Sequence, residues 1–226
     1  MINVLDHGYV RLVDSMGSDL SISRSARVSY DAEWRAGEDY GSDKRLINYL
    51  WRNHHMTPFE SVTFTFEVKA PIFVLRQWHR HRTWSFNEVS ARYTELPEEF
   101  YVPKPKDIGQ QSKSNKQKRI LVEHEERELG KLIMLSAAMA DHNQRAFELY
   151  RQLMLDGVPR EVARTVLPLA TYSRMFATVN LLNLMKFLTL RDDEHAQYEI
   201  TVYAQAMKQL VYPIVPIAIS TWEGCR

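Results

Sequence analysis

The amino-acid sequence predicts an α+β fold in which several long helices pack against an antiparallel sheet, within a single compact domain over residues 1–226. Residues 61–69 alternate strictly between apolar and polar side chains, and residues 171–180, TYSRMFATVN, are typical of a second strand. These strands lie among long helical stretches without regular strand–helix alternation, which favours an antiparallel sheet. A length of 226 residues suits one large domain.

The N-terminal part predicts one short strand and two helices. We expect the strand around residues 10–12, the first helix over about 19–29 and the second over about 42–54. Apolar residues recur at helical spacing most clearly in the second helix. Both helices begin with polar residues that can act as N-caps: Asp19 for the first helix, and Ser42 and Asp43 for the second.

The alternating strand at 61–69 should have one buried face, formed by Val62, Phe64, Phe66 and Val68. Pro71 cannot continue a central strand but suits the first turn of a helix, which we expect over 70–82. The strongly polar segment 76–93 therefore starts on a helix that directly follows a buried strand.

The C-terminal half predicts a loop followed by helices around the second strand. Residues 103–119 contain six Lys or Arg and almost no apolar side chains, which indicates an exposed basic loop. Helical spacing then continues from 120 to 156, where Gly157 ends the helix. Further helices are expected over 159–168, 181–190 and 194–211.

The composition excludes several classes of protein. Lys plus Arg number 29 and Asp plus Glu 28, so a net charge of +1 gives no global attraction to nucleic acid or anionic lipid. One cysteine, Cys225, allows no intramolecular disulfide and no CxxC site, and no signal peptide or run of about 18 apolar residues occurs. We expect a cytoplasmic protein without nucleic-acid or membrane partners.

A phosphate ligand would have to be bound by side chains. The eight glycines form neither a GxGxxG nor a GxxxxGK loop. Arginine is the natural substitute, and five of the seven residues from 76 to 82 are Arg or His. On a helix, Arg76 and Arg80 would share one face and repel each other, so we expect an anionic partner nearby.

Two interpretations of this cluster do not involve catalysis. In the first, it forms ion pairs with nearby carboxylates, for which Glu88, Glu95 and Glu98 are candidates. In the second, arginines interleaved with aromatic residues line a groove that binds single-stranded nucleic acid, and steep salt dependence of oligonucleotide binding would support this alternative.

The same segment resembles the flavin-dependent thymidylate synthases, whose signature is RHR, seven residues and Ser. Arg80, His81, Arg82 and Ser90 have this spacing, and the wider pattern RHRxxSxNExSxR matches in full. Four more similar segments follow the family order: RSARVSY at 24–30, TPFE at 57–60, PREVARTVLP at 159–168 and RDDEHAQYE at 191–199.

The resemblance implies the fold of that family and reductive methylation of dUMP to dTMP. It implies 5,10-methylenetetrahydrofolate as carbon donor, FAD as hydride carrier and NADPH as reductant, in a homotetramer whose active sites are shared between subunits. The methylene can pass directly to the uracil C5 or by way of the flavin.

The resemblance also implies roles for individual residues, with Arg191 as the catalytic group. The dUMP site would consist of Gln77, Arg80, Glu88, Ser90, Arg92, Arg164 and Arg191. The FAD site would consist of Thr57, Arg80, His81, Arg82, Glu88, Asn180 and His195. The folate and nicotinamide side would include His55 and Tyr93. The sequence departs from many relatives at two positions associated with the adenosine of FAD, Leu182 and Lys186.

Uracil chemistry favours an arginine mechanism. C5 becomes nucleophilic when a thiolate adds at C6 or when an anionic N3/O4 edge is stabilised, and Cys225, near the end of the sequence, is an implausible nucleophile. A positioned arginine can stabilise the anionic edge. A carboxylate-bridged dimetal centre requires two carboxylate-x-x-His motifs and two further Glu, whereas Asp192 and His195, with Glu199 one turn further on, give one such motif.

Overall fold

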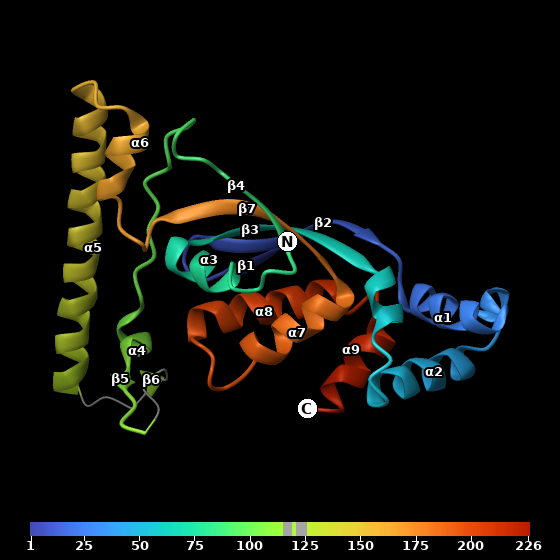
Figure 1. The fold of residues 1–226 in the computed structure, drawn as a ribbon. Coiled ribbons are helices and arrows are strands. Elements are labelled where there is room, and N and C mark those ends of the chain that lie inside the picture. The colour runs from blue at the N-terminus through green and yellow to red at the C-terminus, as the bar shows by residue number, and fades with distance from the viewer. Residues whose placement is uncertain (115–118, 121–125) are drawn as a thin grey trace.

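The computed structural model describes residues 1–114, 119–120 and 126–226, and it confirms the α+β prediction. A five-stranded antiparallel sheet forms the centre of the molecule (Figure 1). Its strands follow the order β1 (Ile2–Val4), β2 (Gly8–Met16), β3 (Thr63–Pro71), β7 (Tyr172–Asn180) and β4 (Ser85–Glu88).

One face of the sheet carries the main hydrophobic core. The four alternating side chains predicted to be buried are fully buried, as expected for a strand packed on one side: Val62, Phe64, Phe66 and Val68. This face is covered by α3 (Ile72–Trp78), α7 (Leu181–Arg191) and α8 (Tyr198–Val211) (Figure 1). Trp78 stacks on Phe187 with ring centroids 4.9 Å apart, which fixes α3 against α7.

The opposite face carries polar side chains around Glu67, a buried residue of β3. Arg11 donates to its carboxylate from Nε (2.8 Å), Tyr9 donates at 2.9 Å, and Arg174 lies 3.4 Å away. Burial alone would raise the pKa of Glu67, but the hydrogen bonds and positive charges around it lower this pKa below its ordinary value. The carboxylate therefore stays ionised at neutral pH.

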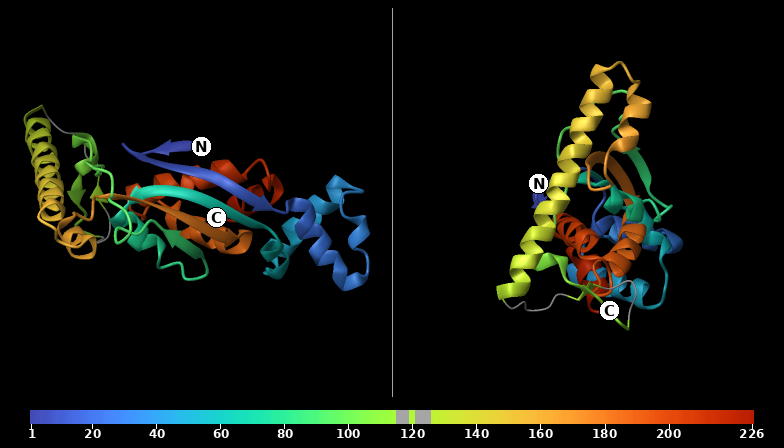
Figure 2. Two further views of the ribbon diagram at one scale, coloured as in Figure 1. Left: turned by 90° about the horizontal axis from the view of Figure 1, so that it is seen from above. Right: turned by 90° about the vertical axis from the view of Figure 1, so that its left-hand side faces the viewer.

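Helices extend from both ends of the sheet (Figure 2). One end carries α1 (Asp19–Arg27), α2 (Tyr40–Arg52), α9 (Pro216–Glu223) and the 3-10 turns η1 (Val28–Tyr30), η2 (Glu33–Arg35) and η3 (Thr57–Ser61). The other end carries α5 (Glu126–Leu155), α6 (Arg160–Ala163) and η4 (Arg164–Val166), with a small core of Phe147, Tyr150 and Ala163.

The segment predicted as an exposed basic loop, 103–119, contains short regular elements. These are α4 (Pro105–Ile108), β5 (Gln110–Gln111) and the first residue of β6 (Arg119–Ile120). Its described lysines, Lys104, Lys106 and Lys113, are exposed, and residues 115–118 lie outside the described part. No helix in the described residues combines the length and apolar character needed to cross a membrane.

The helix caps differ from those predicted. Ser18, not Asp19, is the N-cap of α1, and the buried Asp19 carboxylate caps α9 by accepting from the amides of Ile217 (2.8 Å) and Ala218 (3.0 Å). Helix α2 begins at Tyr40.

The N-cap of α2 is Asp39, and neither Ser42 nor Asp43 has that position. The Asp39 side chain accepts a hydrogen bond from the amide of Gly41 at 2.8 Å. Asp43 instead pairs with Arg27 and accepts from the amide of Gly37 at 2.8 Å.

Several predicted helices are too long. Helix α3 ends at Trp78, where turns at residues 79–84 lead into β4, so Arg76 and Arg80 do not share a helical face. The helix predicted over 159–168 is reduced to α6 and η4, and that over 194–211 begins at Tyr198. The helix predicted from 120 corresponds to α5, and residues 121–125 lie outside the described part. The strand predicted at 171–180 and the helix predicted at 181–190 are confirmed. Three elements were not predicted: β1, β4 and α9.

Candidate active site

The RHR signature lies on the turn between α3 and β4, and the strand separates it from Ser90. Strand β4 pairs with β7 from Ser85, opposite Thr178, to Glu88, opposite Met175. The two halves of the motif therefore stand at the two ends of this four-residue strand.

The arginines of this turn have no ion-pair partners in the described part of the chain. Arg80 and Arg82 are exposed, and the carboxylates proposed as their partners bind elsewhere: Glu95 lies 3.5 Å from Arg160, and Glu98 pairs with Arg151. Glu88 also has no ion pair among the described residues. The prediction of a salt-bridged cluster is wrong, and Arg80 and Arg82 are free to bind an anionic ligand.

Arg191 and His81 are brought into direct contact from positions 110 residues apart. Arg191, the last residue of α7, donates from Nε to Nε2 of His81 at 3.0 Å, and the His81 ring packs edge-on against Phe187. Burial, together with the positive charge of Arg191, lowers the pKa of His81 to about 4. The imidazole is therefore neutral at pH 7 and can accept the hydrogen bond.

The remaining donors of Arg191 are available. Its two terminal nitrogens have no hydrogen-bond partner among the described residues, and the side chain is half-buried. Burial lowers the pKa of Arg191, although a guanidinium stays charged at neutral pH. A partly desolvated guanidinium whose Nε is tethered, and whose terminal nitrogens are free, is well suited to stabilise negative charge on a planar ligand.

Gln77 belongs to a chain of hydrogen bonds that the sequence did not reveal. It donates to Gln197, whose Nε2 donates to the buried carboxylate of Glu199 at 2.8 Å. Glu199 also accepts from Tyr101 and Arg119, each at 3.0 Å. Both Gln197 and Glu199 lie in the segment RDDEHAQYE, whose similarity to the family was the available signal.

The residues after β4 turn toward α6. Ser90 Oγ accepts from the amide of Arg92 at 3.3 Å, and Arg92 lies 3.3 Å from Glu161 of α6. Arg164, which opens η4, is exposed and has no side-chain partner in the described residues. Tyr93 is 79% exposed, and the Arg92 guanidinium lies over its ring, 6.0 Å from the centroid, so the other face of the ring can stack on a ligand.

The residues proposed for FAD come from several elements. Asn180 is the N-cap of α7, where it accepts from the amide of Asn183 at 2.9 Å. Thr57 is exposed at the start of η3, and His55 lies edge-on to Tyr49. His195 contacts Asp193, with Nδ1 2.9 Å from the carboxylate.

Arg164 and Thr57 stand at opposite ends of the sheet. Strands β3 and β7 pair from Thr63 opposite Asn180 to Pro71 opposite Tyr172. Segment η3 precedes β3 at the first end, whereas η4 precedes β7 at the second, so about 26 Å of paired strand lies between these ends. The structure of one chain therefore does not gather all the predicted site residues.

The pockets show the same separation. A pocket of about 380 Å³ contains Glu88 with Arg11 and Arg174, but neither Arg80 nor Arg164. Another of about 430 Å³ contains Arg119, Asp193 and Gln197, but not Gln77.

No metal-binding group of three or more His, Cys, Asp or Glu side chains occurs in the described ranges. The residues of the possible metal motif bind different partners, since Asp192 pairs with Lys208, His195 with Asp193 and Glu199 with Arg119. Leu182, one of the two departures from many relatives, is buried in the core.

Comparisons with known proteins agree with these features. The family model for the thymidylate synthase complementing protein matches residues 11–217. Flavin-dependent thymidylate synthase from Wolbachia pipientis wMel is 44% identical over 98% of this chain and 76% of the relative, and that from Thermotoga neapolitana is 46% identical over 92% and 88%. A crystal structure of the UMP/dUMP methylase PolB from Streptomyces cacaoi bound with 5-Br dUMP superposes with a TM-score of 0.84 at 38% identity, covering 99% of this chain and 97% of that one. On this evidence, the chain belongs to the thymidylate synthase complementing protein family.

Proposed function

We propose that this protein is a flavin-dependent thymidylate synthase that converts dUMP to dTMP by reductive methylation. The carbon comes from 5,10-methylenetetrahydrofolate and the reducing equivalents from NADPH, with FAD as the flavin. Family membership supports the reaction, and the structure supports the way in which the pyrimidine is activated.

The observation that carries the proposal is the state of Arg191. Its Nε is held by neutral His81, while its terminal nitrogens have no partner in the described residues. These donors can stabilise negative charge on the N3/O4 edge of uracil and make C5 nucleophilic. Cys225, the alternative activating group, is an exposed residue next to the C-terminal Arg226.

The arginines predicted for the dUMP site suit a dianionic nucleotide, although Arg92 would have to exchange its exposed contact with Glu161 for the phosphate. Arg80, Arg92 and Arg164 would bind the phosphate of dUMP, and Gln77, Glu88 and Ser90 would provide hydrogen bonds to its sugar and base. Ser90 would act here as a hydrogen-bonding group, because its hydroxyl accepts from the amide of Arg92 and contacts no base among the described residues.

The donor set also fits FAD. Arg80, His81 and Arg82 offer donors for its pyrophosphate, and Thr57, Glu88, Asn180 and His195 would complete the site. Bound FAD would supply the hydride that a folate-only reaction takes from the folate. The exposed rings of His55 and Tyr93 would stack against folate or nicotinamide.

We further propose a homotetramer with shared active sites. The separation of Arg164 from Thr57 supports sharing, since one chain holds them at opposite ends of paired strands. Helix α5 supports assembly, because it exposes neighbouring apolar side chains that a partner chain could cover: Ile133, Met134, Leu135 and Met139.

Two experiments test these proposals. Purified protein reconstituted with FAD should show the visible band of oxidised flavin, lose it with NADPH and regain it on addition of folate and dUMP. A colourless protein that cannot be reconstituted would contradict the assigned function.

For sharing, inactive Arg164→Ala and Thr57→Ala variants should be mixed after dissociation and reassembled. Random mixing should restore about a quarter of the activity if each site takes these residues from different chains. Mixtures as inactive as the separate variants would exclude sharing.

A further inference from the structure

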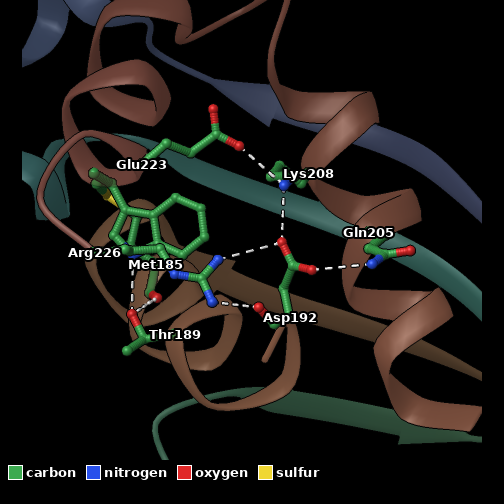
Figure 3. A network of polar contacts seen from close by, with 8 residues as sticks. Met185, Thr189, Asp192, Gln205, Lys208, Glu223 and Arg226 are labelled. Carbon is green, nitrogen blue, oxygen red and sulfur yellow. Dashed lines mark hydrogen bonds and ion pairs between the residues drawn. The ribbon is translucent and has the colours of Figure 1, made fainter. Parts of the chain in front are cut away.

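The end of α7 is held by a charged network around Asp192, the residue after Arg191 (Figure 3). Its Oδ2 accepts from Lys208 at 2.8 Å and its Oδ1 from Gln205 at 3.1 Å. Arg226 donates to the Asp192 carbonyl oxygen and lies 3.5 Å from Oδ2. Asp192 is therefore bound through both its side chain and its backbone.

Helix α9 and the residues after it hold the two cations in place. Glu223 lies 2.9 Å from Lys208, and the Arg226 guanidinium lies over the Trp222 ring, 4.6 Å from its centroid. The Trp222 indole donates to Thr189 of α7 at 2.9 Å. The network therefore joins α7, α8 and α9.

Helix-end physics explains why this matters for α7. The last carbonyl groups of a helix lack intrahelical partners, and a carboxylate beside them is unfavourable unless cations compensate. Lys208 and Arg226 provide that compensation, while Arg226 also satisfies the Asp192 carbonyl. Partial burial alone would lower the pKa of Lys208, but its bonds to Asp192 and Glu223 raise it, so the amine stays charged.

We propose that the Asp192 network is a positioning device for Arg191, which fixes the last turn of α7 so that the guanidinium stays against His81 with its terminal nitrogens available to the pyrimidine. This inference rests on the proposed role of Arg191. Among the described residues that side chain forms one hydrogen bond, from Nε to His81, so its placement depends on the backbone that carries it. Asp192 and Lys208 act through Arg191 and need not touch substrate.

The first test follows the position of Arg191 without any turnover. In the unmodified full chain, NMR titration should give His81 a low pKa, because the ring is partly buried and the positive charge of Arg191 lies beside it. Asp192→Ala should let the guanidinium move away, and the His81 pKa should rise. Asp141→Ala, which removes an exposed carboxylate paired with Arg145 on α5, is the matched control and should leave it unchanged.

The second test measures kinetics. Asp192→Ala should lower kcat by roughly 10- to 100-fold, since a displacement of about 1 Å has such an effect, with unchanged FAD binding. Asp192→Asn keeps one acceptor oxygen but loses the charge and the second acceptor, so its loss of kcat should be smaller than that of Asp192→Ala. Lys208→Met should lower kcat in the same direction, and combining it with Asp192→Ala should add little.

The outcomes distinguish a failure of this inference from a failure of the proposed function. A lower melting temperature with the same His81 pKa and the same kcat would show that the network is only structural and would overturn the proposal. If Asp192→Ala shifts the His81 pKa but the unmodified protein makes no dTMP, the positioning stands and the proposed function fails. Asp192→Asn and Lys208→Met provide the same readouts should the alanine variant not fold.

Discussion

Replacing Arg191 with alanine should remove most turnover while FAD stays bound. The side chain is half-buried, and Nε donates to His81 at 3.0 Å while the terminal nitrogens are free in the described structure. If these nitrogens stabilise charge that develops on the pyrimidine, their loss should cost about 2.7–4 kcal/mol, or roughly 10²- to 10³-fold in kcat. Loss of the nearby positive charge should also raise the pKa of His81.

The assay compares dTMP formation at saturating dUMP, folate and NADPH with dUMP affinity and the visible flavin spectrum. Arg191→Lys keeps the positive charge but loses the planar fork, so it should be intermediate. Arg145→Ala is the matched control, because this arginine forms an exposed pair with Asp141 at 2.9 Å on α5. It should behave like the unmodified protein.

Retention of kcat within about threefold in a folded Arg191→Ala protein would refute the reasoning, since another group would then activate the pyrimidine. Loss of bound FAD together with turnover would assign the residue to the cofactor instead. A fall in dUMP affinity with unchanged kcat would indicate ground-state binding rather than stabilisation of developing charge.

Three further predictions concern other parts of the chain. Arg80→Ala should weaken dUMP binding by roughly 10- to 100-fold in calorimetric titration, the effect of losing a charge-assisted hydrogen bond, and unchanged affinity would remove it from the phosphate site. Cys225→Ser should leave turnover unchanged, whereas a large loss would restore the thiolate route. Asp19→Ala should lower the free energy of unfolding in urea by about 2–4 kcal/mol, because two buried amides lose their acceptors, and Asp19→Asn should lose less; equal losses would contradict the capping role.

Local pattern was sufficient to predict the parts of the fold that have one buried face. The alternation in 61–69 predicted the burial of Val62, Phe64, Phe66 and Val68, since strand geometry alone sends successive residues to opposite faces, but it did not predict the burial of Glu67 on the other face. Strand β4 shows the limit. Its sequence SFNE carries little apolar signal, and it is a strand because β7 offers a free edge for pairing. Edge pairing is a non-local property and does not appear in the strand's own sequence.

Helix caps show the same limit. An acidic residue near the start of a helical stretch predicts a cap for that helix. Asp19 stands in the first turn of α1, yet its carboxylate binds the amides at the start of α9, 198 residues further along the chain. The residue type indicated the chemistry, but tertiary packing selected the helix. The same holds for Asp43, which pairs with Arg27 instead of opening α2.

In the candidate site, too, the sequence indicated which residues matter, and tertiary packing decided their partners. The motif identified Arg80, Arg82 and Arg191 as candidates for anion binding, but the sequence also allowed them to be paired with carboxylates. The fold removes that possibility, because Glu95 pairs with an arginine of α6 and Glu98 with an arginine of α5. Arg80 and Arg82 keep their donors, and the neutral ring of His81 holds Arg191 through one nitrogen without neutralising it. A near-neutral chain thus presents a local excess of positive charge, and a dianionic nucleotide is the class of ligand that would compensate it.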